Sequence, residues 1–143
     1  MELKQIMTRD VAVVRPNAPV REAAEKMKTL DIGALPVCTG RRMVGMLTDR
    51  DITLRVVAEG RDPMNTRAEA VMTPDVTYCF EDQDVAEAAA LMAEQQIRRL
   101  PIINRDKELV GILSLGDLAV DTNQAMLAGD VLEDISQPAK PKR

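Results

Sequence analysis

The 143-residue sequence contains no histidine and no tryptophan, and it has only two cysteines, one tyrosine and one phenylalanine. Without histidine there is no Ser–His or Cys–His pair and no histidine-rich metal site. An enzyme would have to work with carboxylates or lysines alone, and no spaced group of these residues suggests one. We therefore predict that the protein is not an enzyme, with no catalytic residue and no metal site.

Aromatic residues make up 1% of the chain, so the core must be aliphatic. Proteins that bind single-stranded nucleic acids rely on stacking of bases against aromatic side chains. The formal net charge of −4 also disfavours a polyanionic partner. We predict no nucleic-acid partner.

Long apolar runs are missing as well. The first five residues lack the apolar region of a secretion signal, and no stretch approaches the roughly 20 apolar residues of a membrane span. We expect a cytoplasmic protein with no membrane partner. Cys38 and Cys79 fall in apolar runs without CxxC spacing, which predicts buried free thiols; a disulfide or redox switch is the alternative.

The sequence does contain a duplication. When the chain is shifted by 65 positions, Met7-Thr8 falls on Met72-Thr73 and Leu35-Pro36 falls on Leu100-Pro101. One extra loop residue in the second copy raises the offset to 66. The later matches are Val44-Gly45 on Val110-Gly111, Thr48 on Ser114 and Asp51 on Asp117. This ordered series of matches indicates a tandem repeat.

Each copy has the pattern of a β-α-β-β-α unit, which predicts a mixed α/β (α+β) fold in which a pseudo-twofold tandem forms one module. The predicted strands are 11–14, 35–38 and 43–47 in the first copy, and 76–80, 100–103 and 109–113 in the second. Second helices are expected from about Asp49 and Leu115. The first helix of each copy has an apolar stripe, formed by Val20, Ala23, Ala24, Met27 and Leu30, and by Val85, Ala88, Ala89 and Met92.

The predicted boundaries follow the repeat. They are 6–60 for the first unit, 61–70 for a linker rich in helix breakers and charge, and 71–122 for the second unit. A C-terminal helical segment at 123–137 and a disordered basic tail at 138–143 complete the chain.

The motif that carries chemistry is a strand followed by Thr48-x-x-Asp51, repeated as Ser114-x-x-Asp117. A helix N-terminus offers unpaired amides to a phosphate, and a hydroxyl there adds a further hydrogen bond. A carboxylate one turn along is placed to accept the hydroxyls of a ribose. The same motif is also typical of helix N-capping. The two interpretations are compatible for the hydroxyls and less so for the carboxylates.

The repeated string resembles the CBS domain, which commonly occurs in pairs called Bateman modules, and the chain is similar to small stand-alone bacterial proteins with two such repeats. The resemblance rests on Met7-Thr8, residues 31–37 and 44–51 in the first copy, and residues 71–73, 97–102 and 110–117 in the second. It implies a non-catalytic regulatory module that binds AMP, ADP or ATP, or alternatively S-adenosylmethionine, without a required cofactor. It also implies a homodimer that signals to another, unknown, protein.

The resemblance further implies two clefts, each joining the corner of one copy to residues of the other. Asp117 and Asp51 would bind ribose, and phosphate would contact Ser114, Thr48, Arg99 and Arg98. The first cleft would join Ser114 and Asp117 to an adenine pocket of Thr8, Ala12, Ile32, Gly33 and Ala34. The second would join Thr48 and Asp51 to Thr73, Thr77, Ile97 and Arg98. Because Arg98-Arg99 stands where the first copy has Gly33-Ala34, the first cleft is favoured. Solvated surface charge is the alternative for both arginines.

Two other functions stay open. The chain would be a ligand-free dimerising scaffold if the apolar pairs Val56-Val57, Met126-Leu127 and Val131-Leu132 pack between protomers. A small enzyme or redox protein would have to use Cys38 or Cys79.

Overall fold

The computed structural model describes residues 1–120 and 125–138. The chain forms two compact units. We call Ala12–Val76 the central unit, and we call Met1–Val11 together with Thr77–Arg143 the terminal unit. The N-terminal segment of the first repeat therefore packs with the second repeat. The repeat boundaries inferred from sequence stay a prediction.

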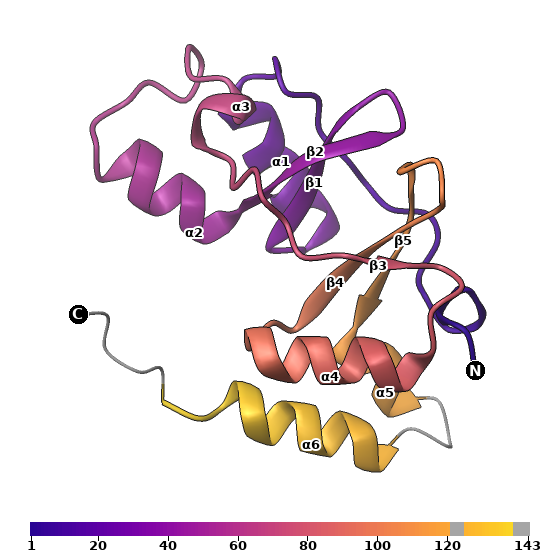
Figure 1. The fold of residues 1–143 in the computed structure, drawn as a ribbon. Helices are drawn as coiled ribbons and strands as arrows, with labels where there is room; N and C mark the ends of the chain where they lie inside the picture. The colour runs from indigo at the N-terminus through magenta and orange to yellow at the C-terminus, as the bar shows by residue number, and fades with distance from the viewer. Residues whose placement is uncertain (121–124, 139–143) are drawn as a thin grey trace. The chain divides into compact units, whose positions relative to one another are not determined.

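The central unit contains a hairpin of two antiparallel strands flanked by short helices (Figure 1). Its elements are α1 (Val20–Leu30), β1 (Ala34–Thr39), β2 (Arg42–Thr48), α2 (Asp49–Ile52), a π-helical turn η2 (Thr53–Val57) and α3 (Ala68–Val71). Leu35 pairs with Leu47 across the hairpin, and both are fully buried. Val20, Ala23 and Met27 of α1 pack into the same aliphatic core.

The terminal unit has a three-stranded sheet of order β3-β4-β5, with β3 parallel and β5 antiparallel to β4. Its elements are η1 (Leu3–Gln5), β3 (Cys79–Phe80), α4 (Val85–Gln95), β4 (Arg99–Ile103), β5 (Leu109–Ser114), α5 (Leu115–Val120) and α6 (Ala125–Ile135). Helix α6 lies beside α4 (Figure 1), and Ala128 and Val131 of α6 are buried in the core of this unit.

The predicted mixed α/β class is confirmed, and the same features recur in both copies. Helices α1 and α4 each end at a residue in the left-handed conformation, Asp31 and Gln96, both with φ of 54°. The apolar stripe of α4 is buried as predicted. In α1 the prediction fails at Leu30, which is 51% exposed because it lies at the last helical residue, beyond the edge of the core.

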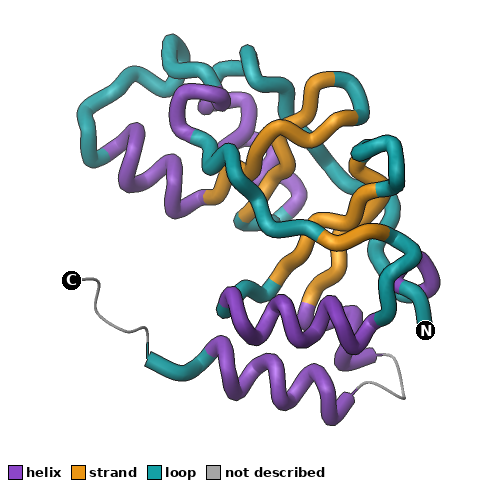
Figure 2. The backbone as a smooth tube through the Cα atoms, in the orientation of Figure 1, coloured by secondary structure: helices purple, strands orange, loops and turns teal. Residues whose placement is uncertain are grey.

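The first predicted strand of each copy is shorter than expected. Val14 makes a single parallel bridge to Val37, and in the second copy only Cys79–Phe80 is a strand, as Figure 2 shows by the loop on either side. The difference between the copies has a local cause. The N–H of Glu81 donates to the carbonyl of Ile103 and extends β3, whereas the equivalent residue in the first copy, Pro16, has no N–H to donate.

The Met-Thr segment of each copy pairs with a strand of the other copy. Thr8 exchanges two backbone hydrogen bonds of 2.9 Å with Ile112 in β5, and Thr73 does the same with Met46 in β2 at 2.8 and 2.9 Å. A side chain at Gly111 would approach the Met7 sulfur to 2.6 Å and the Thr8 carbonyl oxygen to 2.9 Å. Gly45 faces Met72 and Thr73 in the same way. The glycine of each repeated Val-Gly pair, which has no side chain, thus leaves room for the Met-Thr segment of the other copy.

The C-terminal helical segment predicted at 123–137 contains α6, Ala125–Ile135. The tail prediction for 139–143 lies outside the described residues, as do the side chains of Met126 and Leu127.

Candidate functional site

Two strand-to-helix corners form the candidate site, one in each unit. The central corner lies where β2 ends at Thr48 and α2 begins at Asp49. The N–H of Asp51 donates to the Thr48 hydroxyl at 3.0 Å, and the N–H of Thr48 donates to Oδ2 of Asp51 at 3.0 Å. These two reciprocal hydrogen bonds to the backbone fix the positions of both the Thr48 hydroxyl and the Asp51 carboxylate.

The terminal corner repeats this geometry. The N–H of Asp117 donates to Oγ of Ser114 at 3.0 Å, and the N–H of Ser114 donates to Oδ2 of Asp117 at 2.8 Å. Both motifs are reciprocal capping boxes, so the capping interpretation is confirmed at both positions. Capping uses Oδ2 of each carboxylate, which leaves Oδ1 with acceptor capacity for another partner.

Each carboxylate has a different neighbour beyond its cap. The Thr8 hydroxyl lies 3.4 Å from Oδ1 and 3.5 Å from Oδ2 of Asp117. At the central corner the guanidinium of Arg55 lies 3.9 Å from Oδ1 of Asp51. The same guanidinium donates to the carbonyls of Val71 and Met72 at 2.8 and 3.2 Å, which ties Asp51 to the segment leading into Thr73.

The two corners therefore differ in charge. In the sequence alignment of the two copies, Arg55 corresponds to an acidic residue, Asp121. The Asp117 carboxylate is approached by a neutral hydroxyl, whereas the Asp51 carboxylate is approached by a cation.

The segments before Leu-Pro lie against the corner of their own copy. The carbonyl of Gly33 accepts from the N–H of Asp49 at 2.9 Å, and the carbonyl of Arg98 accepts from the N–H of Leu115 at 3.0 Å. Across the strands, Ala34 pairs with Thr48 and Arg99 pairs with Ser114. The side chains of Arg98 and Arg99 are exposed.

The structure thus places the predicted site residues in two groups. The terminal unit holds Thr8, Thr77, Ile97, Arg98, Arg99, Ser114 and Asp117, and the central unit holds Ala12, Ile32, Gly33, Ala34, Thr48, Asp51 and Thr73. Within these groups Thr8 lies beside Asp117, and the Thr73 backbone pairs with β2 ahead of Thr48. The predicted clefts, which combine residues of the two groups, stay a prediction.

Both thiols are free and buried, as predicted. Burial raises the pKa of Cys38 to about 11, and burial together with the Glu87 carboxylate raises the pKa of Cys79 to about 11. Neutral buried thiols are poor nucleophiles, which disfavours a redox or nucleophilic role.

In the described residues no group of three or more His, Cys, Asp or Glu side chains is arranged to hold a metal ion. Within the same ranges, no helix is both long and apolar enough to cross a bilayer.

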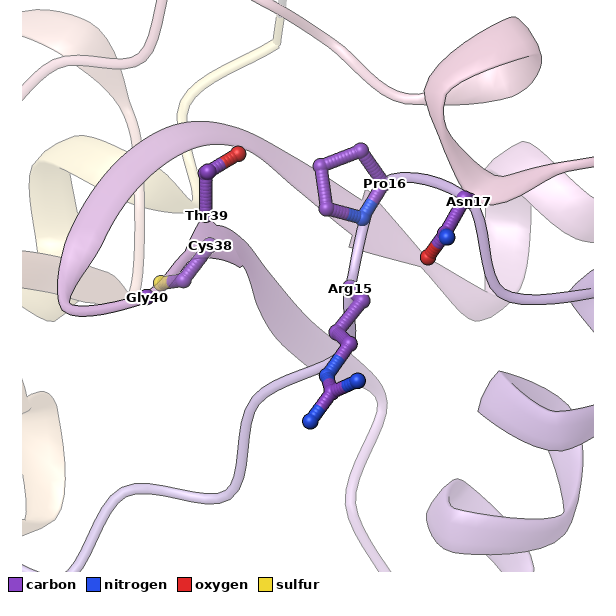
Figure 3. A pocket seen from close by; sticks show the side chains of 6 residues that line it. All are labelled: Arg15, Pro16, Asn17, Cys38, Thr39 and Gly40. Carbon is purple, nitrogen blue, oxygen red and sulfur yellow. The ribbon is translucent and has the colours of Figure 1, made fainter.

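Sequence reasoning missed a hollow of about 400 Å³ in the central unit. It is lined by Arg15, Pro16, Asn17, Cys38, Thr39 and Gly40, none of which belongs to the predicted nucleotide site (Figure 3).

The fold and the two corners can be compared with known proteins. The family model described as "CBS domain" matches residues 3–58 and 68–120. The CBS domain-containing protein YhcV of Bacillus subtilis is 45% identical over 134 residues, which are 94% of each chain.

Two solved structures share the fold. One, the crystal structure of Hypoxic Response Protein I with two coordinated zinc ions, is 35% identical with a TM-score of 0.77, covering 85% of this chain and 98% of that one. The other, the CBS domain protein PAE2072 of Pyrobaculum aerophilum complexed with AMP, is 25% identical with a TM-score of 0.77, covering 90% and 98%. The chain belongs to the CBS domain family and contains two CBS domains in tandem.

Proposed function

We propose that the protein is a non-catalytic regulatory module that binds an adenine nucleotide (AMP, ADP or ATP) and signals its occupancy to a partner protein. The observation that carries the proposal is the duplicated corner at the end of a strand. In each copy a hydroxyl and a carboxylate three residues apart are fixed by reciprocal hydrogen bonds to the backbone: Thr48 with Asp51, and Ser114 with Asp117. The likeness to the AMP complex of PAE2072 supports the choice of ligand.

Capping restricts what each carboxylate does in this proposal. Because Oδ2 already accepts a backbone N–H, a ribose hydroxyl is accepted by Oδ1. An ionised acceptor makes hydrogen bonds roughly twice as strong as a neutral one, so the acid is the main anchor for the sugar.

The amides at the helix N-termini are not the main phosphate ligands in this proposal. Helices α2 and α5 have four and six residues, and the amides of Asp51 and Asp117 already donate to the hydroxyls of Thr48 and Ser114. We therefore assign the phosphate to the Arg99 and Arg98 guanidiniums, whose planar forks match phosphate oxygens. The Ser114 and Thr48 hydroxyls supply further hydrogen bonds.

Asp117 is the favoured ribose anchor of the two. Its carboxylate is approached by the neutral Thr8 hydroxyl, whereas Arg55 approaches that of Asp51. A guanidinium near Asp51 competes with a ribose hydroxyl for Oδ1, so the Asp117 site is expected to bind more tightly.

Thermal unfolding tests the proposal, because a ligand of the folded state raises the melting temperature. AMP, ADP, ATP and S-adenosylmethionine are compared at millimolar concentration. Asp117→Asn retains an oxygen that accepts the capping N–H and removes the charge; it is expected to weaken nucleotide binding about tenfold or more. Asp130→Asn, on the exposed face of α6, is the matched control. A melting temperature unchanged by all four ligands would refute the proposal.

A ligand-free dimerising scaffold is the second candidate. Leu54 and Val57 on η2 are 47% and 70% exposed, which leaves apolar surface on the central unit. Val56 and Val131 are buried in the cores of their units and are not available to a second protomer. Among the described residues of the predicted dimer contact, this leaves Val57 and the 45% exposed Leu132 of α6. Sedimentation of Val57→Lys against the parent chain tests it: a dimer that persists without nucleotide and dissociates on substitution supports the scaffold.

A further inference from the structure

The hollow in the central unit is lined by two segments that face each other (Figure 3). Arg15, Pro16 and Asn17 form one side, and Cys38, Thr39 and Gly40 at the end of β1 form the other. The side chains of Arg15 and Asn17 are exposed, and Cys38 is buried.

The repeat supplies an internal comparison for this hollow. At the offset of 65, Arg15 corresponds to Phe80, Asn17 to Asp82 and Gly40 to Arg105. The backbones match: the N–H of Ala18 donates to the Arg15 carbonyl at 3.1 Å, as the N–H of Gln83 donates to the Phe80 carbonyl at 3.0 Å.

In the terminal unit the equivalent place is filled. The Arg105 guanidinium lies 4.1 Å from the centre of the Phe80 ring, and it donates two hydrogen bonds to the Asp82 carboxylate, at 2.8 and 3.1 Å. Cation, carboxylate and ring thus form a closed cluster whose charges cancel.

Three residue differences between the repeats leave the equivalent position in the central unit unfilled. Gly40 has no side chain to occupy the position of Arg105, which leaves the hollow. Arg15 replaces the ring with a guanidinium, and Asn17 replaces the carboxylate with a neutral amide. No hydrogen bond or ion pair joins the Arg15 side chain to another residue within 1–120 or 125–138. Glu69, whose N–H reaches the Pro16 carbonyl, pairs its own carboxylate with Arg67 at 3.8 Å.

We propose that this hollow binds a small carboxylate-bearing molecule, which occupies the space that the Arg105 side chain fills in the other repeat. The Arg15 guanidinium pairs with the carboxylate, and the Asn17 amide donates a further hydrogen bond. The volume of about 400 Å³ admits a small organic acid. This site is distinct from the two corners and does not depend on the proposed nucleotide binding.

Titration of the isotope-labelled full chain with succinate, at constant ionic strength, tests the proposal by amide and side-chain NMR shifts. Saturable shifts at Arg15, Asn17 and Gly40 are expected. Arg15→Gln is expected to weaken succinate binding about tenfold or more. Asn17→Asp, which supplies the carboxylate internally, is expected to have the same effect without loss of the fold.

The matched control is Arg61→Gln, an exposed arginine of the same unit, which is expected to leave succinate binding unchanged. Asp117→Asn is also expected to leave it unchanged, which separates this site from the nucleotide site. Absence of saturable shifts, equal binding by the Arg15→Gln protein, or binding of inorganic phosphate but not of succinate would each overturn the proposal.

Discussion

The hydroxyl of Thr8 lies 3.4 Å from Oδ1 of Asp117, 109 residues further along the chain. The contact exists because the segment containing Thr8 leaves its own repeat and pairs with β5. It joins a residue of the first CBS domain to the acid of the second.

Replacement of Thr8 by Val removes this hydroxyl and retains the backbone pairing with Ile112. Because Thr8 is exposed, little change in stability is expected. AMP affinity should fall about three- to tenfold, since the hydroxyl helps to orient the Asp117 carboxylate. Calorimetric titration measures the change, and an unchanged or tighter dissociation constant would show that Thr8 does not serve the site.

Replacement of Gly111 by Ala tests the crossing of the Met-Thr segment. The new methyl group would lie 2.6 Å from the Met7 sulfur and 2.9 Å from the Thr8 carbonyl oxygen, so the segment must shift. Overpacking of this kind costs about 1–3 kcal/mol of unfolding free energy.

Gly129→Ala in α6 is the control, because a methyl group there meets no atom within 4 Å. It should stabilise the protein by about 0.5–1 kcal/mol through helix propensity. Urea denaturation compares the two, and equal stabilisation by both substitutions would exclude the close approach at Gly111.

The buried thiols predict a pH dependence. Their pKa values are raised from 9.0 to about 11 in the folded protein. Well below pH 9 both folded and unfolded thiols are protonated, so their contribution to stability is fully present. As pH rises from 9 towards 11 the unfolded chain loses these protons first, and the unfolding free energy should decrease.

Denaturation at pH 8 and pH 10, with Cys38→Ala and Cys79→Ala as references, isolates this effect. The same burial predicts slow thiol labelling of the native protein and fast labelling in urea. Rapid labelling of either cysteine under native conditions would reopen the redox interpretation.

The Asp82–Arg105 pair predicts a titration shift. The hydrogen bonds from Arg105 lower the pKa of Asp82, so this carboxylate favours the folded state above its ordinary pKa, and the benefit is lost as pH falls through the lowered value. Arg105→Gln should return the pKa of Asp82 towards its usual range. Carboxyl NMR titration measures the pKa of Asp82, with Arg61→Gln as the control. If the pKa of Asp82 is as low in the Arg105→Gln protein as in the parent protein, the paired geometry is contradicted.

The duplication carried most of what could be predicted. The stripe from Val85 to Met92 marked a helix because its period matches one helical face, and Thr48-x-x-Asp51 marked a strand-to-helix corner because capping is local chemistry. The capping pattern alone did not decide between a structural and a binding role. In the structure Oδ2 of each acid accepts the capping N–H, and Oδ1 takes no part in the cap.

Long-range pairing was harder to infer. Nothing local in Met7-Thr8 indicates that it leaves its repeat, and the role of Gly111 follows only from that crossing. The shortened first strand had a signal in Pro16, whose missing N–H ends the ladder. The hollow also had a signal in the sequence, since alignment of the copies sets Gly40 against Arg105. That difference indicates a hollow only once the contact of Arg105 with Phe80 is known.

Native mass spectrometry of the gently purified protein tests the central claim most directly. We predict a bound mass equal to that of an adenine nucleotide, present in the parent protein and diminished in Asp117→Asn. A protein that carries no such mass, and acquires none when AMP, ADP or ATP is added, would contradict the account.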